Sequence, residues 1–281
     1  MNNKILTNYE EVFNKIVNKT EKYVKENNIQ CMVLGISGGI DSTVVATICR
    51  EVSNNTGIPL IGRSLTILNK KEEFSLAKKV GNSLCDDFKE IYLWNSYMTL
   101  SEDFENSEGH GTAISEGNIM ARLRMIYLYN IAGLKKGIVM DTDNLTEHYL
   151  GFWTIHGDEG DFNPIGGLWK TEVYGLAKWI LDFYNEKSET IQDAVRESIN
   201  AIPTDGNGIS SSDLEQIGGK DYYEVDKILI PLVTKGDIRD KLILEEGFSK
   251  EVVDKIWNRY LGSAFKRKTE RVIKIERNEL F

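Results

Sequence analysis

Residues 35–42, Gly-Ile-Ser-Gly-Gly-Ile-Asp-Ser, have the composition of a loop that binds phosphate. Its glycines permit positive φ and leave backbone N–H groups free to converge on an anion at the start of a helix. Ser37 and Ser42 add neutral hydroxyl donors. Asp41 would repel a phosphate unless a cation lay between them, so this residue indicates bound Mg²⁺. A turn with glycines for close packing is the alternative, but packing does not call for two serines and an aspartate.

The order Ser-Gly-Gly-x-Asp-Ser separates this loop from two common nucleotide-binding loops. No Gly-Lys-Ser/Thr follows the glycines, as a Walker A sequence requires, and the order is not the G-x-G-x-x-G of dinucleotide folds. It resembles instead the pyrophosphate-binding loop of the ATP pyrophosphatases. Those enzymes cleave ATP between its α and β phosphates and form an acyl or base adenylate, which implies that ATP is a co-substrate.

A second polar segment, residues 141–147, follows a strand predicted at 136–140. The carboxyl ends of parallel strands lie at one edge of a sheet, so this segment should meet the loop at 35–42. We expect Glu147 to approach Asp41 across a shared Mg²⁺. Two carboxylates, phosphate oxygens and waters make a suitable octahedral shell for that ion.

Lys170 lies in the first turn of a helix predicted at 168–180. The helix dipole favours anions at this end, so a lysine there is better explained by a bound phosphate. The preceding residues 151–167 are rich in glycine and acids, and we interpret them as a loop that closes over the nucleotide. Both features place a phosphate ligand next to Lys170.

These residues require a scaffold of alternating strands and helices. Apolar runs predict strands at 31–35, 59–67, 88–94 and 136–140, with helices predicted at 8–26, 42–51, 70–84 and 116–132. The alternation predicts an α/β fold, a Rossmann-like parallel sheet with helices on both faces. A helical C-terminal elaboration follows, with helices at 188–200, a short one from 222, and others at 238–246 and 250–261. We expect a mobile surface loop at 101–115, a flexible turn-rich segment at 201–213, and one domain over 1–281.

Composition restricts the function further. The 281 residues carry a net charge of −9, which argues against a nucleic-acid partner because such binding needs broad basic surface. The three cysteines form no metal-binding or disulfide pattern. The first residues lead into no hydrophobic signal and no apolar run has the length of a membrane span. We therefore expect a cytoplasmic protein without a membrane partner.

Five segments together resemble the ammonia-dependent NAD synthetases over roughly residues 8–268. They are the loop 35–42, Gly117-Asn-Ile-Met-Ala-Arg-Leu-Arg-Met125, the T-D-x-x-x-E of Thr142 to Glu147, the G-D…N-P-I-G…K-T-E-V of Gly157 to Val173, and Pro203-Thr204. The resemblance implies that the carboxylate of deamido-NAD attacks the α-phosphate of Mg-ATP, which gives an adenylate and pyrophosphate. Ammonia then displaces AMP and leaves NAD. It also implies a homodimer whose dinucleotide site borrows from both subunits.

The resemblance assigns roles to individual positions. Asp41 and Glu147 would bind Mg²⁺, and the ATP contacts would be Gly35, Ile36, Ser37, Gly38, Gly39, Ile40, Asp41, Ser42, Thr142, Lys170 and Thr204. Deamido-NAD would contact Arg122, Asp161, Phe265 and Lys266. Asp41, Lys170 and Asp158 are the predicted catalytic residues, with Asp158 holding or deprotonating the incoming ammonium. A structural Asp that closes a loop turn is the alternative for Asp158.

Three positions depart from the family pattern. Many members have Gly where Asp141 stands, Lys where Ile155 stands and His where Phe265 stands. A missing cation at 155 should weaken recognition of the dinucleotide's negative charge, whereas Phe265 offers a ring for stacking. Two other functions stay open: an ATP pyrophosphatase with another acceptor, and a relative that binds adenine nucleotide without turnover. Nothing in the sequence resembles a glutaminase, so we expect free ammonia as the nitrogen source.

Overall fold

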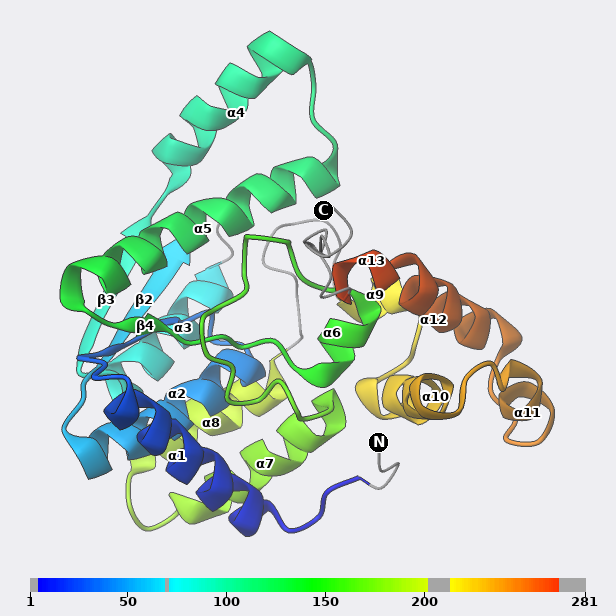
Figure 1. Ribbon diagram of the computed structural model, residues 1–281, viewed down its shortest axis with the longest axis horizontal. Helices are drawn as coiled ribbons and strands as arrows, with labels where there is room; N and C mark the ends of the chain where they lie inside the picture. Colours follow the sequence, from blue (N-terminus) through cyan, green and yellow to red (C-terminus); the bar gives the residue numbers. More distant parts are fainter. Residues whose placement is uncertain (1–4, 69–70, 202–212, 268–281) are drawn as a thin grey trace, which may run out of the picture.

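Four parallel strands form the central sheet of the computed structural model, which describes residues 5–68, 71–201 and 213–267 (Figure 1). The strands lie in the order β3-β2-β1-β4, and their bounds are β1 Met32–Gly35, β2 Leu60–Thr66, β3 Asp87–Tyr92 and β4 Ile138–Val139. Met32 of β1 is in register with Leu60 on one side and Ile138 on the other. The predicted parallel α/β sheet is therefore confirmed.

Helices cover both faces of this sheet, as predicted. The first eight are α1 Tyr9–Glu26, α2 Ile40–Thr56, α3 Lys71–Leu84, α4 Trp94–Glu108, α5 Ala113–Lys135, α6 Leu145–Leu150, α7 Lys170–Phe183 and α8 Glu189–Asn200. One core joins the sheet to α1, α2, α3, α7 and α8, and a smaller core joins it to α5 on the opposite face (Figure 1). Residues 32–34 are fully buried because β1 has strands on both sides and helices above and below.

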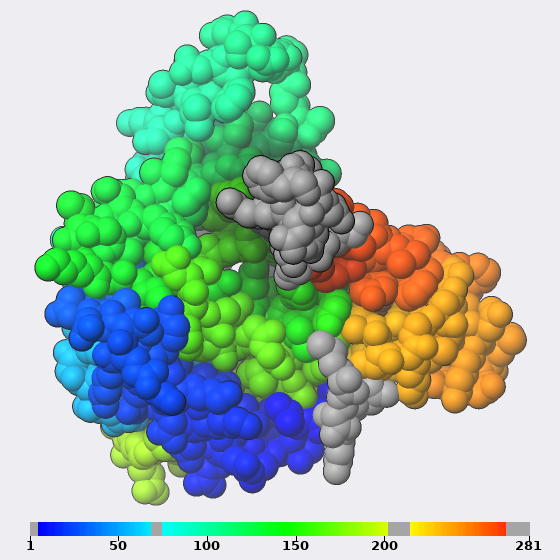
Figure 2. All heavy atoms as spheres, viewed as in Figure 1, coloured from blue at the N-terminus to red at the C-terminus, as the bar shows by residue number. Residues whose placement is uncertain are grey.

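The C-terminal helices have a core of their own. They are α9 Asp213–Ile217, α10 Tyr222–Lys235, α11 Arg239–Leu244, α12 Lys250–Gly262 and α13 Ala264–Arg267. Apolar side chains of α10 and α12 pack with α6 and Trp169 in this core, which forms a lobe beside the sheet (Figures 1 and 2). Helix α10 is longer than the short helix predicted at 222, because Pro231 removes only one N–H donor and the helix continues past it.

The predicted surface loop at 101–115 is wrong. Most of this segment belongs to α4 and to the start of α5, and Figure 2 shows α4 as a ridge at one end of the molecule. Polar, acidic sequence suits an exposed helix as well as a loop. Tyr97 and Ser101 on α4 donate hydrogen bonds to the Glu116 carboxylate on α5, which joins the two helices.

Several predicted boundaries also differ from the structure. Strand β3 ends at Tyr92, before the predicted 94, and β4 contains only two residues, followed by a single bridge from Met140 to Phe162. The predicted flexible segment at 201–213 lies almost wholly outside the described residues. No helix among the described residues has both the length and the apolar character needed to cross a membrane.

Candidate active site

The loop after β1 leads directly into α2, so its N–H groups lie at the positive end of a helix. Gly38 has a φ of 84°, and a Cβ there would lie 2.7 Å from the backbone N of Ala77 on α3. Positive φ is thus needed at Gly38, but not at the other two glycines of the loop. Ile36 and Ile40 are buried, so these two residues can offer phosphate only their backbone.

Two hydroxyls hold this loop in shape. Ser37 Oγ and Ser42 Oγ lie 2.9 Å apart, and Ser37 Oγ accepts the N–H of Gly39 at 3.1 Å. Ser42 Oγ also lies 3.0 Å from the carbonyl oxygen of Gly39. The serines therefore fix the path of the loop in addition to offering polar atoms at its surface.

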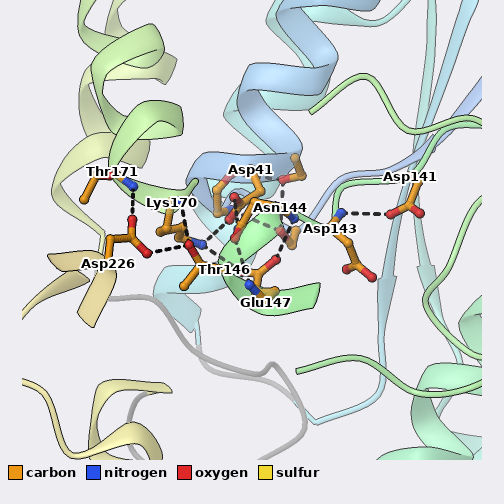
Figure 3. A network of polar contacts seen from close by, with 12 residues as sticks. Asp41, Asp141, Asp143, Asn144, Thr146, Glu147, Lys170, Thr171 and Asp226 are labelled. Carbon is orange, nitrogen blue, oxygen red and sulfur yellow. Dashed lines mark hydrogen bonds and ion pairs between the residues drawn. The ribbon is translucent and has the colours of Figure 1, made fainter. Parts of the chain in front are cut away.

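Lys170 brings the two predicted metal ligands together (Figure 3). Its ammonium nitrogen Nζ lies 2.5 Å from Asp41 Oδ2 and 2.9 Å from Glu147 Oε1. Only 2% of Lys170 is exposed, and Nζ lies 5.1 Å from the centre of the Tyr222 ring. Residues from α2, α6, α7 and α10 thus converge on one charged group.

The charges of this cluster do not balance. Burial alone would lower the pKa of Lys170, but the charges of Asp41 and Glu147 outweigh it and raise that pKa well above its ordinary value. The pKa of Glu147 is raised to about 7, chiefly by burial; the charge of Lys170 opposes this rise and the charge of Asp41 adds to it. One ammonium faces two acids, so the cluster has an excess of negative charge that another cation can neutralise.

The donor atoms fit a hard divalent cation. Asp41 and Glu147 present oxygen atoms to a single point, now held by the Lys170 ammonium, and Mg²⁺ prefers oxygen ligands. Across the described part of the chain, no three His, Cys, Asp or Glu side chains gather as a metal-binding group. Two protein carboxylates are enough for Mg²⁺, which usually completes its shell with water and substrate phosphate.

Asn144, which was not predicted from the sequence, fixes the positions of the Asp41 and Glu147 carboxylates. It is fully buried, and its Nδ2 donates to Asp41 Oδ1 at 2.9 Å. It also begins α6 with a capping box, in which Asn144 Oδ1 accepts the N–H of Glu147 and Glu147 Oε2 accepts the N–H of Asn144. The N-x-x-E spacing of a capping box was the available signal for this residue.

A polar cavity of about 90 Å³ adjoins this cluster. Its lining includes Asp141, Asp143, His148, Trp153, Glu159 and Asn163. Trp153 is 6% exposed, and its Nε1–H donor finds no acceptor among the described residues. A buried donor without a partner is uncommon, so the cavity is suited to a ligand with an acceptor atom. The carboxylates beside it suit a group with positive charge.

The pKa of Asp141 determines a pH dependence of stability. The pKa of this carboxyl is raised to about 6, chiefly by burial; hydrogen bonds from the N–H groups of Asp143, Gly160 and Thr142 oppose the rise, and the charge of Asp158 adds to it. The ordinary pKa is 3.8, so the folded protein holds this proton to a higher pH than the unfolded chain does. The stabilising contribution of Asp141 is complete below the ordinary pKa and is lost as the pH rises through the folded value.

We expect Asp141→Asn to remove this pH dependence, because an amide does not titrate. As the pH rises from about 4.5 to about 7, wild type should lose about 2 kcal/mol of its free energy of unfolding relative to the variant. Urea denaturation of both proteins at the two pH values measures the change. A difference that stays the same at both pH values would contradict a raised pKa at Asp141.

The remaining predicted acids lie in the loop after α6. Asp158 is exposed as a whole residue, but its carboxyl accepts the N–H of Thr154 at 2.6 Å. Asp161 accepts the Tyr129 hydroxyl at 3.0 Å with one oxygen and the N–H of Val139 at 3.1 Å with the other. Asp158 thus keeps more capacity for a ligand than Asp161 does.

The residues predicted to contact the dinucleotide are spread around this loop. The Arg122 guanidinium donates to the carbonyl oxygen of Ile155 at 3.3 Å. Lys266 on α13 donates from Nζ to the carbonyl oxygen of Gly151 at 2.7 Å and to that of Trp153. Phe265 is 61% exposed.

Two predicted ATP contacts, Thr142 and Thr204, lie outside the glycine-rich loop and away from Lys170 in sequence. Thr142 is partly buried and lies three residues after the end of β4. Thr204 lies outside the described residues.

Comparison with known proteins points to one family. The NAD synthase family matches residues 12–270. The NH(3)-dependent NAD(+) synthetase of Fusobacterium nucleatum is 30% identical over 276 residues, which cover 98% of this chain and 100% of that protein.

Two solved structures share the fold. One is the NH3-dependent NAD synthetase from Campylobacter jejuni in complex with the nitrate ion, with a TM-score of 0.71 and 27% identity over 95% of this chain and 100% of that one. The other is NMN synthetase from Francisella tularensis, with a TM-score of 0.76 and 24% identity over 95% of this chain and 99% of that one. At that identity the second likeness shows the fold alone.

Proposed function

This chain belongs to the NAD synthase family, and we propose that it catalyses the ATP-dependent amidation of deamido-NAD by ammonia. The products are NAD, AMP and pyrophosphate, and the enzyme is a ligase that forms a C–N bond. The observation that carries the proposal is the Lys170 ammonium between Asp41 and Glu147, beside the glycine-rich loop. This arrangement serves a polyphosphate with a bound cation.

The first half-reaction needs positioning and neutralisation of charge. The N–H groups of residues 35–42 and the N-terminus of α2 bind phosphate oxygens, and Lys170 neutralises the polyphosphate. Mg²⁺ held by Asp41 and Glu147 would supply further neutralisation of phosphate charge. The acceptor carboxylate can then attack the α-phosphorus and expel pyrophosphate, a step that requires little covalent help from protein groups.

The second half-reaction takes place next to the polar cavity. Ammonia displaces AMP from the adenylate, and because ammonium must lose a proton to become a nucleophile, a nearby carboxylate is needed. We propose Asp158 for this task, since its loop also supplies Glu159 and Trp153 to the cavity lining. The Trp153 Nε1–H donor suits an oxygen of the acceptor's carboxyl group.

A second acceptor competes with deamido-NAD. It is the mononucleotide of nicotinic acid, which presents the same carboxylate but carries one phosphate instead of two. Position 155 favours this alternative because Ile155 brings no cation toward the second phosphate of a dinucleotide. Arg122 and Lys266 still supply two cations near the loop, so deamido-NAD stays the first proposal.

A pyrophosphate assay with different acceptors tests the function. We expect purified protein with Mg-ATP and ammonium to release pyrophosphate and form NAD when deamido-NAD is present, with a kcat/KM above that for the mononucleotide. Glutamine in place of ammonium should give no amide. A higher kcat/KM for the mononucleotide would establish the second acceptor. Binding of ATP with no pyrophosphate from any acceptor would show a nucleotide-binding relative without turnover.

We further propose a cytoplasmic homodimer in which residues 1–281 act as one domain. Exposed large apolar side chains of α4 and α5 support association with a second copy. They include Phe104, Ile114, Ile126 and Leu134, whose exposed fractions are 47%, 66%, 59% and 78%. Phe104 is on α4 and the other three are on α5. Apolar side chains that form a large exposed patch mark a protein interface.

A further inference from the structure

We propose that Asp226, on α10, is a positioning residue for the reaction. It holds the first turns of α6 and α7 together, and through them it sets where Glu147 and Lys170 meet. This inference rests on the proposed function, because it gives Lys170 and Glu147 their task. It assigns a part in that site to the C-terminal helices.

One carboxylate links two helices here (Figure 3). Asp226 Oδ1 accepts the hydroxyl of Thr146 at 2.6 Å, and Asp226 Oδ2 accepts the N–H of Thr171 at 2.8 Å. Thr146 Oγ1 in turn accepts the N–H of Lys170 at 2.9 Å. Asp226 is 1% exposed and Thr146 is fully buried, so water does not replace these contacts readily.

The two linked residues are next to the two that form the ion pair. Thr146 precedes Glu147 on α6, and Thr171 follows Lys170 on α7. A shift in either first turn would therefore move Glu147 or Lys170 relative to Asp41. Asp226 acts on the backbone that carries the Lys170 ammonium: directly through the Thr171 N–H, and through the Thr146 hydroxyl, which accepts the Lys170 N–H.

Helix α7 needs such a contact because its own N-terminus lacks a side-chain cap. The residue at the N-cap is Trp169, which provides no side-chain hydrogen bond there. The first N–H groups of a helix have no partner within the helix and need acceptors from elsewhere. Thr146 and Asp226 supply them for Lys170 and Thr171, and negative charge is also favourable at this end of a helix.

Helix α10 contacts Lys170 from a second point. Tyr222 precedes Asp226 by one helical turn, so both residues lie on the same face of α10. The Tyr222 ring lies under the Lys170 ammonium, whereas Asp226 holds the backbone of the same turn. The C-terminal lobe thus contacts both the side chain and the main chain at the start of α7.

Asp226→Asn and a pair of Thr146 variants test this role. The two donors use different oxygens of Asp226, and an amide has an acceptor at only one of these two positions. Misplacement of a catalytic group by about 1 Å costs on the order of a hundredfold. We expect Asp226→Asn to lower kcat by about tenfold to a hundredfold with the KM for ATP changed less than threefold. Thr146→Val, which keeps the shape without the hydroxyl, should show the same defect, and Thr146→Ser should recover most of the rate.

A matched control separates positioning from general stability. Asp86 also uses its carboxylate to tie elements together, accepting from Arg50, Ser53 and the N–H of Leu60, but it does so far along the chain from Lys170. Asp86→Asn should lower the melting temperature and leave kcat as in wild type. Equal rates in wild type, Asp226→Asn and Thr146→Val, or equal loss in Thr146→Ser and Thr146→Val, would overturn the proposal.

A binding measurement keeps this test independent of the reaction. Calorimetric titration with Mg-ATP, on Lys170→Met with and without Asp226→Asn, should show no further change in ATP affinity from the second substitution. An additional loss of affinity in the double variant would show that Asp226 does not act through Lys170. If wild type released pyrophosphate with no acceptor, the proposed function would fail, while this titration would still decide the coupling of Asp226 to Lys170.

Discussion

Replacement of Lys170 with alanine is expected to lower the rate of pyrophosphate release by about 10³-fold. The buried ammonium is the cation that Asp41 and Glu147 face, and the proposed reaction needs it on the polyphosphate as negative charge moves to the leaving group. A buried donor of this kind acts with little competition from water. Its loss should therefore affect kcat more than the KM for ATP.

The fold should survive this substitution. Burial already raises the pKa of Glu147 to about 7, so without the ammonium this acid can take up a proton. Asp41 then keeps its hydrogen bond from Asn144 Nδ2. One carboxylate charge with a hydrogen-bond donor beside it is tolerated at a partly exposed position, and circular dichroism should match that of wild type.

Lys178→Ala is the matched control, because Lys178 lies on the same helix with its side chain exposed. It should release pyrophosphate at the wild-type rate. Rapid-quench measurement of pyrophosphate, with deamido-NAD and ammonium at saturation, compares the two variants directly. Near-normal turnover in Lys170→Ala would remove this lysine from the reaction, and equal loss in both variants would show an effect on the helix instead.

The fold could be predicted because its signals are local. The residues Met32 to Leu34 form a short apolar run between helical patterns, and such a run is typical of a central parallel strand. The acidic stretch that forms α4 was predicted wrongly because its local signal is ambiguous. Its residues pack little apolar surface, so local composition could not distinguish an exposed helix from a loop.

The meeting of Lys170 with Asp41 and Glu147 could be predicted only in part. The loop motif and the sheet topology placed Asp41 and Glu147 at one edge, but Lys170 is 129 positions from Asp41 in sequence. Its distance to the carboxylates depends on how α7 packs, which periodicity does not determine. Asp226 gave a weaker signal still: an acid among Val225, Ile228 and Leu229 on a buried face.

Such an acid could have been noticed as polar in an apolar pattern. Its partners could not have been named, because they are a hydroxyl and an N–H group on two other helices. The contacts of a helix N-terminus depend on tertiary packing whenever the N-cap residue cannot accept a hydrogen bond. That is the situation created by Trp169, and it explains why the sequence alone does not connect Asp226 with Lys170.

Glu147→Gln should raise the Mg²⁺ concentration needed for half-maximal pyrophosphate release by at least about a hundredfold. The substitution keeps the shape of the side chain and one acceptor for the capping box, where glutamine also serves. It removes the charge and the oxygen that faces Lys170. Helix α6 should therefore persist while the predicted metal site loses one of its two carboxylates.

The control for this variant is Glu116→Gln, which makes the same chemical change in a carboxylate that accepts two hydroxyls between α4 and α5. Its Mg²⁺ requirement should equal that of wild type. Titration with Mn²⁺ in the presence of ATP, followed by electron paramagnetic resonance, measures cation binding without turnover. If Glu147→Gln bound Mn²⁺ as tightly as wild type, the cation would have to be held by Asp41 and phosphate alone. Glu147 would then serve as the counter-charge that keeps Lys170 in place.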